Sequence, residues 1–446
     1  MLPNIRENHQ MTRRTFLILS GTTTLYSLSG CKHITSSNSQ TSSEKIYAFY
    51  GDTLENRIVA IDVENMKLLS STYTEGDTPY TIGRAGDEDK FYAITRGSNA
   101  CDVLDIHSRK LIKRIPLEHS PRSCAFNQYN NLQLISGKNK PMSSLVDVKT
   151  DTVIAVVGRN TTVNPLDYGG SNATGHPIWI DTNTFALLDR EIRQIVLYRV
   201  FKNETQWEVI PLHTLDTPTA VHHFIGRGPD AMNNGLLKSD TLTDTFYAVT
   251  EGTADNTPGN AITPSIIKIK YKNDSLSIIG ETHLPKESWG AHHATFTPDN
   301  KNIYLGLASG VLFIINKDSM EIVKSVNTGK GCGHTTFIPQ KNLAVVTNHH
   351  DTFISIIDMT TQNKIADITV SGPKINNTIL QSHTSFTDLS GNFFYAFATD
   401  NGKFYEVDLN TLKVTRTLYT GGTPKQGCHL LRNIYTDKYS RIQNSY

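Results

Sequence analysis

The chain of 446 residues carries almost no net charge, because 43 basic residues face 42 acidic ones and leave a formal charge of +1. Such a balance provides no broad basic surface, so we expect no nucleic-acid partner. No C-x-x-C-H string occurs, which excludes covalently attached haem. The G-x-S-x-G string of serine hydrolases and a glycine-rich nucleotide loop between a strand and a helix are also absent.

Long helical periodicity is missing from residue 45 onward. Apolar residues instead alternate in short bursts that are broken by Gly, Asn, Asp and Pro, a pattern typical of many short strands. The bursts recur in sets at a period of about 42 to 55 residues. In one set N-I-Y-L-G-L, V-L-F-I-I-N and E-I-V-K-S-V follow one another between residues 302 and 326. The repeat predicts an all-β fold, a β-propeller over residues 45–435.

The blade count follows from the strand expected to be innermost in each set. Seven such segments precede full sets, and an eighth, G-C-H-L-L at 427–431, comes after the last one. The set that begins at residue 45 lacks an inner strand, so we expect the C-terminal segment to supply it and close the ring without an open sheet edge. We therefore predict eight blades, with residues 436–446 as a tail. Seven blades are the alternative, because the segments 159–174 and 226–241 blur two boundaries.

The first residues have the pattern of an export signal. T-R-R-T-F-L at 12–17 resembles a twin-arginine signal, and the stretch after it is too short to span a membrane. A general secretion signal is the alternative. L-S-G-C at 28–31 resembles a lipoprotein processing box, so we expect 1–30 to be a signal peptide and Cys31 to be lipidated. Residues 31–44, rich in Ser and Thr, then form a flexible tether at the periplasmic side of a bacterial membrane.

Sixteen histidines are present, and most of them follow residue 170. The inner-strand strings G-H-T-T-F, S-H-T-S-F and H-H-A-T-F place His334, His383 and His293 in one register. His429, His176 and one of His222/His223 lie close to this register. Because inner strands begin near the central channel, these side chains are predicted to surround one of its mouths. Side chains alternate along a strand, so only one residue of His292/His293 and one of His222/His223 is expected to face the shared site.

A second group of polar residues is expected on the same face. T-N-H-H-D-T at 347–352 lies in a turn between a second and a third strand, and such turns open beside the starts of the inner strands. Carboxylates at comparable strand ends are expected to complete or orient a site. The candidate metal ligands are His176, His222, His223, His292, His293, His334, His349, His350, His383, His429, Asp351 and Asp189.

Histidines in register on adjacent blades point to a transition metal ion, because neutral imidazole is the commonest protein ligand of zinc and copper. We expect Zn²⁺, with copper as the alternative. The competing explanation is that duplicated blades inherited a histidine that bonds to the backbone of a neighbour. Cys332 and Cys428 lie beside the register as candidate soft ligands. A disulfide is favoured between Cys101 and Cys124 over one between Cys332 and Cys428, and buried thiols without a role are an equal alternative.

These repeats resemble the YVTN-type propeller family, and the blade count resembles the haem-binding propeller of cytochrome-type nitrite reductases. The chain also resembles periplasmic zinc metallochaperones of the AztD type, which pass zinc to the solute-binding protein of an importer. That resemblance implies zinc as the ligand, a solute-binding protein as partner, and the function of a metallochaperone or metal-acquisition factor, here as a periplasmic lipoprotein. It implies zinc ligands among His176, His222, His293, His334, His349 and His383.

Two other functions stay open. The first is a copper- or haem-dependent oxidoreductase, because tandem histidines on propeller strands resemble the copper site of nitrous oxide reductase. The second is a metal-free propeller that serves as a scaffold for protein contacts.

Overall fold

The structure is a computed structural model that describes residues 44–84, 88–127, 129–162, 172–204, 206–225, 245–252 and 262–442. The chain divides into two units, Met1–Ser42 and Ser43–Tyr446, and only the second unit contains described residues. The predicted signal peptide, Cys31 and the tether up to residue 43 lie outside the described residues. The described part contains no helix that is long and apolar enough to cross a membrane.

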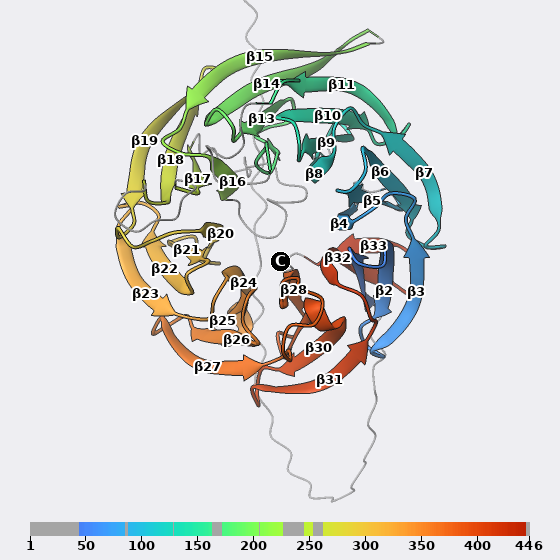
Figure 1. Cartoon of the computed structure of the whole chain (residues 1–446), viewed down its shortest axis with the longest axis vertical. Helices are drawn as coiled ribbons and strands as arrows, with labels where there is room; N and C mark the ends of the chain where they lie inside the picture. Colours follow the sequence, from blue (N-terminus) through green and yellow to red (C-terminus); the bar gives the residue numbers. More distant parts are fainter. Residues whose placement is uncertain are drawn as a thin grey trace, which may run out of the picture. The chain divides into compact units, whose positions relative to one another are not determined.

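Eight antiparallel sheets are arranged in a ring around a centre, as Figure 1 shows. This confirms the predicted eight-bladed β-propeller and excludes the seven-bladed alternative. The innermost strands of successive blades contact one another in all but one place, between blades 4 and 5, where the inner strand of blade 5 instead contacts the second strand of blade 4. From blade 1 to blade 8 these inner strands are β32 (Pro424–Asn433), β4 (Pro79–Arg84), β8 (Pro121–Asn127), β12 (Ile178–Trp179), β16 (Val221–Ile225), β20 (Ala291–Phe296), β24 (Cys332–Ile338) and β28 (Gln381–Thr387).

The second and third strands of each blade are mostly buried on both faces, because neighbouring blades cover them. In the same blade order, the second strands are β1 (Glu44–Asp52), β5 (Lys90–Thr95), β9 (Leu132–Gly137), β13 (Thr184–Asp189), β17 (Thr245–Thr250), β21 (Asn302–Leu307), β25 (Leu343–Asn348) and β29 (Phe393–Ala398). The third strands are β2 (Arg57–Asp62), β6 (Ala100–Asp105), β10 (Met142–Asp147), β14 (Gln194–Asn203), β18 (Ser265–Lys272), β22 (Val311–Asn316), β26 (Phe353–Asp358) and β30 (Lys403–Asp408).

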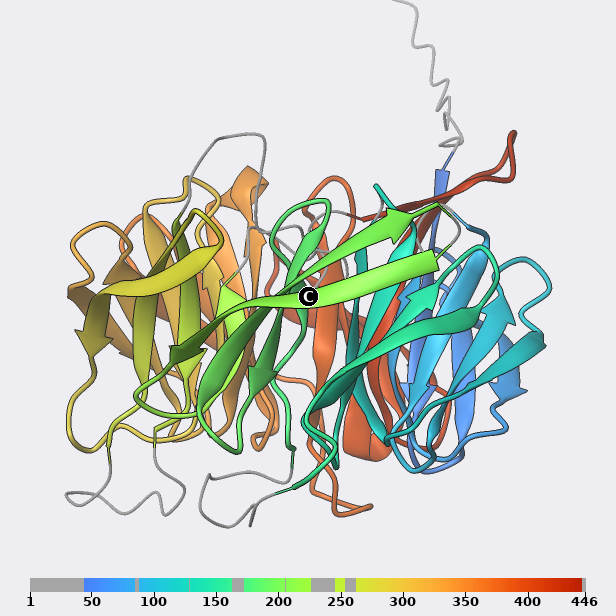
Figure 2. The ribbon, with the colours of Figure 1, turned by 90° about the horizontal axis from the view of Figure 1, so that it is seen from above.

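The outer strand of each blade alternates between covered and exposed residues, because one of its faces meets solvent. The outer strands are β3 (Lys67–Tyr73), β7 (Leu111–Pro116), β11 (Thr152–Gly158), β15 (Gln206–Asp216), β19 (Ser275–His283), β23 (Ile322–Asn327), β27 (Asn363–Thr369) and β31 (Lys413–Tyr419). Two short 3₁₀ turns follow second or inner strands, η2 (Pro339–Lys341) and η3 (Thr399–Asn401). Figure 2 shows the blades from the side, with the turns on two opposite faces.

The ring closes in blade 1 as the sequence predicted. Strand β32 pairs with β1 from Glu44↔Asn433 to Asp52↔Pro424, so the C-terminal segment supplies the missing inner strand. A short strand, β33 (Tyr439–Arg441), adds to β32 and extends the sheet beyond residue 435. Because blade 1 joins the two ends of the propeller, hydrogen bonds across it hold the ring shut.

Eight apolar clusters form the core, one in each gap between adjacent blades. The cluster between blades 2 and 3 contains both Cys101 and Cys124, which pack there as small apolar side chains. The two cysteines form no disulfide, so the favoured Cys101–Cys124 bridge is wrong. Burial raises the pKa of the Cys101 thiol well above its ordinary value.

Candidate metal centre

The inner strands share an irregularity near their starts. In seven of the eight blades the pairing register between the inner and second strands shifts there. A bulge inserts extra backbone and re-aims side chains, and bulges are over-represented beside functional sites. In blades 1, 2 and 3 the shifted segments contain Lys425, Tyr80 and Arg122. In blades 5, 6, 7 and 8 they contain His222, His292, His334 and His383. In blade 4, His176 lies between an isolated bridge of Thr174 with Asp189 and strand β12.

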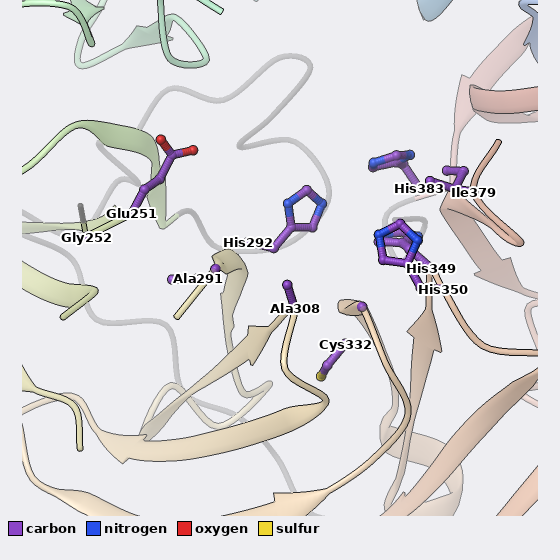
Figure 3. Close-up of a pocket in the computed structure, with 12 residues that line it drawn as sticks. Glu251, Gly252, Ala291, His292, Ala308, Cys332, His349, His350, Ile379 and His383 are labelled. Atoms are coloured by element: carbon purple, nitrogen blue, oxygen red, sulfur yellow. The ribbon is translucent and has the colours of Figure 1, made fainter. Parts of the chain in front are cut away.

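Four imidazoles from blades 6, 7 and 8 converge. His292, His334 and His383 come from three successive inner strands, and His349 comes from the turn after β25. One ring nitrogen of each lies within 4.8 Å of the corresponding nitrogens of the others. In Figure 3, His292, His349 and His383 point toward one another across a pocket. We call these four residues the four-histidine cluster.

All four imidazoles of this cluster are neutral at pH 7. Burial, together with the charge of neighbouring imidazoles, lowers the pKa of His292 to about 4 and that of His349 to about 3. The same causes hold the pKa values of His334 and His383 well below the ordinary value. Neutral imidazole is the form that ligates a metal ion. The cluster therefore does not have to release protons when it binds a metal ion.

The direction of one lone pair in the cluster is fixed by a backbone hydrogen bond. His349 Nδ1 lies 2.9 Å from the carbonyl oxygen of Gln381, which only accepts, so Nδ1 carries the proton and Nε2 carries the lone pair. That Nε2 atom is buried without a hydrogen-bond partner in the described structure, as are His292 Nε2 and His334 Nδ1. Buried polar atoms are normally satisfied, so three orphaned nitrogens in one cluster fit a metal ligand set.

A glycine makes room for the His349 ring. A Cβ added to Gly333 would lie 2.2 Å from His349 Nε2, far inside van der Waals contact. Residue 333 immediately precedes His334 on β24, so the strand that supplies one ligand also leaves the space for another. The G-C-G-H string therefore has a steric reason for its second glycine.

A tyrosine of blade 2 contacts the cluster at His383. The Tyr80 hydroxyl lies 3.1 Å from both ring nitrogens of His383. The guanidinium of Arg96 stacks on the Tyr80 ring, with its carbon 3.4 Å from the ring centroid. Tyr80 therefore connects the four-histidine cluster to the cationic side chains of blades 2 and 3.

Four further histidines extend the cluster into a row of rings. His293 stacks on His334 with ring centroids 3.9 Å apart, and His223 stacks on His293 at 4.8 Å. The Nδ1 atoms of His222 and His223 are 2.9 Å apart, so one ring donates to the other. His176 follows, with its ring centroid 5.2 Å from that of His222.

Both members of one tandem pair contact the same partner, because His292 and His293 each contact the ring of His334. Only His292 of this pair belongs to the four-histidine cluster, and His293 stacks on the His334 ring. The bulge between Ala291 and His293 interrupts the regular alternation of the strand.

The remaining candidate ligands lie elsewhere or are already engaged. His429 is buried, bonds through Nε2 to the Tyr50 hydroxyl at 2.8 Å and stacks on Phe386. Its string G-C-H-L-L places it four residues beyond Lys425, the residue in the bulge of that strand. His429 is thus held by side chains of the propeller core and lies outside the four-histidine cluster.

Asp189 and Asp351 are occupied by other partners. The Asp189 carboxylate binds the guanidinium of Arg159, with Nε 2.7 Å from Oδ2. Asp351 Oδ2 accepts the backbone N–H of Lys330 at 2.6 Å. His350 is exposed but belongs to the lining of the pocket beside the cluster. The structure thus brings eight of the predicted histidines into one network and leaves the two aspartates out of it.

The pocket has a volume of about 250 Å³, and Figure 3 shows several of its side chains. Besides histidines, its lining includes Glu251 and Cys332. Glu251 Oε1 lies 4.0 Å from His222 Nε2, and its other oxygen bonds to Arg190. Burial raises the pKa of Cys332 to about 11, so this side chain is a thiol rather than a ligating thiolate at neutral pH. Cys428 lies in the core between blades 1 and 2.

Three residues beside this network escaped the sequence reasoning: Tyr80, Arg96 and Arg122. The signal for two of them was present, because T-P-Y-T and P-R-S-C put Tyr80 and Arg122 one residue after the start of an inner strand, as A-H-H-A does for His292. Tyrosine and arginine are not usual ligands of zinc, so a metal-site prediction does not include them.

No family model matches the chain, and no curated protein matches its sequence. Among solved structures it is similar to the dihydro-haem d1 dehydrogenase NirN in complex with DHE. That match has a TM-score of 0.59 and 12% identity, and it covers 88% of this chain and 75% of that chain. It is also similar to apo AztD from Citrobacter koseri, with a TM-score of 0.55 and 13% identity, over 87% of this chain and 98% of that chain. At such identity the likeness shows the propeller fold alone.

Proposed function

We propose that the protein binds a transition metal ion, zinc in the first place, at the four-histidine cluster and carries it at the cell envelope. The observation that supports this proposal is the convergence of four neutral imidazoles within 4.8 Å, two of them buried and two partly buried. A set of neutral nitrogen ligands suits zinc and copper and disfavours magnesium or calcium, which prefer oxygen.

The distances within the cluster suit reversible binding of a metal ion. Zinc–nitrogen bonds of about 2.0–2.1 Å place tetrahedral ligands about 3.3 Å apart, so the rings must close by up to about 1.5 Å around the ion. His349 belongs to a turn rather than a strand, and His292 and His383 are only partly buried. A pocket that is open to solvent, with ligands that must close, favours a carrier over a permanent structural site.

The row of four further histidines supports transfer along the channel mouth. His293, His223, His222 and His176 follow one another at ring distances of 4.8 to 5.2 Å from blade 6 to blade 4. An ion that leaves the four-histidine cluster would meet a succession of imidazole ligands instead of an apolar wall. The resemblance to AztD-type chaperones suggests the solute-binding protein of a metal importer as recipient.

The export signal and lipidation at Cys31 belong to the same proposal. Together they place a carrier on the periplasmic side of a bacterial membrane, attached through lipid. Metabolic labelling with a radioactive fatty acid tests this part, since the full-length chain should incorporate label and its Cys31→Ser variant should not.

Copper is the second candidate ion, because an all-imidazole set also suits it. The pocket of about 250 Å³ lies below the range of roughly 300–1,000 Å³ that is usual for organic ligands, which favours an ion over a haem-type macrocycle. If the purified protein is coloured, the alternative of a copper- or haem-dependent oxidoreductase is supported instead.

Elemental analysis of the purified full-length protein, together with its visible spectrum, tests the proposal. We expect a colourless protein that binds zinc in competition with a chromophoric chelator. The double variant His334→Ala/His383→Ala should lose this binding. The matched control replaces His213 on β15 and His283 on β19 by alanine, because both lie on outer strands. Absence of zinc and copper binding by the folded wild-type protein would overturn the proposal.

A further inference from the structure

The half of the channel mouth that faces the histidines is cationic. The shifted segments of blades 1, 2 and 3 carry Lys425, Tyr80 and Arg122 where blades 5 to 8 carry histidine. Arg96 stacks on Tyr80, and the ammonium of Lys425 lies 5.9 Å from the centroid of the same ring. One mouth therefore contains neutral metal ligands on one side and a group of positive charges on the other.

Arg122 is the most unusual member of this group. Its side chain is 97% buried, yet Nε and Nη1 have no hydrogen-bond partner in the described structure. Its charge acts on Tyr80 of blade 2 and on His176 and His222 of blades 4 and 5. Arg122 also occupies the same shifted position of its inner strand as His222 and His292 do in blades 5 and 6. A buried guanidinium with two unpartnered nitrogens is costly unless a ligand supplies acceptors.

Nearby carboxylates do not provide those acceptors. Glu251 is close enough to act on the charge of Arg122, but its Oε2 atom binds Arg190. Asp400 accepts the backbone N–H groups of Asn376 and Thr378. Oε2 of Glu251 and the carboxylate of Asp400 are therefore engaged with other partners.

We propose that Arg122 forms the core of an oxyanion site at the channel centre, which Arg96 and Lys425 support, and that the anion binds together with the metal ion. The ligand class is a small carboxylate or phosphate, because two oxygens of such an anion match the planar fork of a guanidinium. The metal-linked part of this inference rests on the proposed function, whereas the arginine site itself exists in the metal-free protein.

Charge balance links the two sites. A divalent ion bound by four neutral imidazoles brings two positive charges to the channel mouth. The mouth already holds the positive charges of Arg96, Arg122 and Lys425. An oxyanion between the two halves offsets this repulsion, so each ligand strengthens the binding of the other. Tyr80 joins the halves physically, since its ring carries Arg96 and its hydroxyl contacts His383.

Calorimetric titration of the metal-free full-length protein with oxalate and with inorganic phosphate tests the arginine site. We expect binding of at least one probe, and the tighter probe identifies the carboxylate or the phosphate class. The variant Arg122→Gln should weaken binding about tenfold or more. The matched control is Arg199→Gln, since Arg199 lies on β14 and pairs with Asp274 away from the channel. Arg122→Lys keeps the charge without the fork and should fall between wild type and Arg122→Gln.

The linkage is tested by measuring zinc affinity with and without the bound oxyanion. The oxyanion should raise zinc affinity, and zinc should raise oxyanion affinity by the same factor, as thermodynamic reciprocity demands. If the anion binds and zinc does not, the carrier function fails while the arginine site stands. If wild-type protein binds neither probe at millimolar concentration, or binds it equally well in folded Arg122→Gln and Arg122→Lys, the inference is overturned.

Discussion

His349 donates its Nδ1–H to the backbone carbonyl of Gln381 across 2.9 Å, and this bond leaves the lone pair on Nε2, in a cluster with His292, His334 and His383. Gln381 begins β28, the strand that also supplies His383. The start of one strand therefore provides a ligand and orients a second ligand from the neighbouring blade. Hydrogen bonds to the non-ligating nitrogen fix the tautomer and ring orientation of metal-bound histidines.

Replacing His349 by alanine should weaken zinc binding roughly 100-fold, because one of four nitrogen ligands is lost. Competition with a chromophoric chelator measures the change. His350→Ala is the matched control, since the adjacent His350 lines the same pocket but is exposed and outside the cluster. Equal losses in the two variants would show that His349 is not a ligand.

Replacing Gly333 by alanine should also weaken zinc binding, by roughly 10- to 100-fold, although no ligand is removed. The added Cβ would lie 2.2 Å from His349 Nε2, so the ring must leave its position. Gly372→Ala is the control, because a Cβ there would meet nothing closer than Asn401 Nδ2 at 3.9 Å. Unchanged affinity in a folded Gly333→Ala protein would contradict the assigned orientation of His349.

The repeat in the sequence was sufficient to predict the blades. The bursts at 302–307 and 311–316 coincide with β21 and β22, because strands covered on both sides must be apolar over their whole length. The closing strand was also predictable, since a first set without an inner strand leaves an unpaired edge. Strand pattern and edge pairing are local properties that a single sequence carries.

The detailed geometry of the site could not be derived in the same way. Whether His292 and His293 face one side depends on the bulge between Ala291 and His293, and a bulge has no clear signature in A-H-H-A-T-F. The engagement of Asp189 by Arg159 depends on where two distant segments meet in space. Register shifts and long-range ion pairs follow from the packed ring, so they become visible only in three dimensions.

Removing the closing strand should destroy cooperative folding. A chain that ends after residue 421 lacks β32, so β1 loses its partner from Glu44 to Asp52 and presents an open edge. We expect aggregation and loss of a sharp thermal transition, measured by light scattering and circular dichroism. A chain that ends after residue 435 is the control, because it lacks only β33 and should fold with a modestly lower melting temperature. A cooperative melt of the shorter chain would show that the other blades close without it.

Zinc affinity should change little between about pH 7.5 and pH 5, whereas exposed histidine sites lose affinity below about pH 6.5. In the metal-free folded protein the pKa of His292 is about 4 and that of His349 is about 3, so a proton competes with zinc only in stronger acid. Chelator competition across this pH range measures the effect. A steep loss of affinity that begins at pH 6.5 would show that the cluster is more hydrated than its burial indicates.

The same depressed pKa values make stability fall in acid. Below pH 6.5 the unfolded chain binds protons at these histidines while the folded chain does not, so the free energy of unfolding decreases as the pH drops toward 4. The melting temperature of the metal-free protein should therefore be level above about pH 7 and decline below it. In the His334→Ala/His383→Ala variant the decline should be shallower, because two of the buried imidazoles that cause it are gone. A decline of equal slope in both proteins would assign the acid sensitivity to other groups.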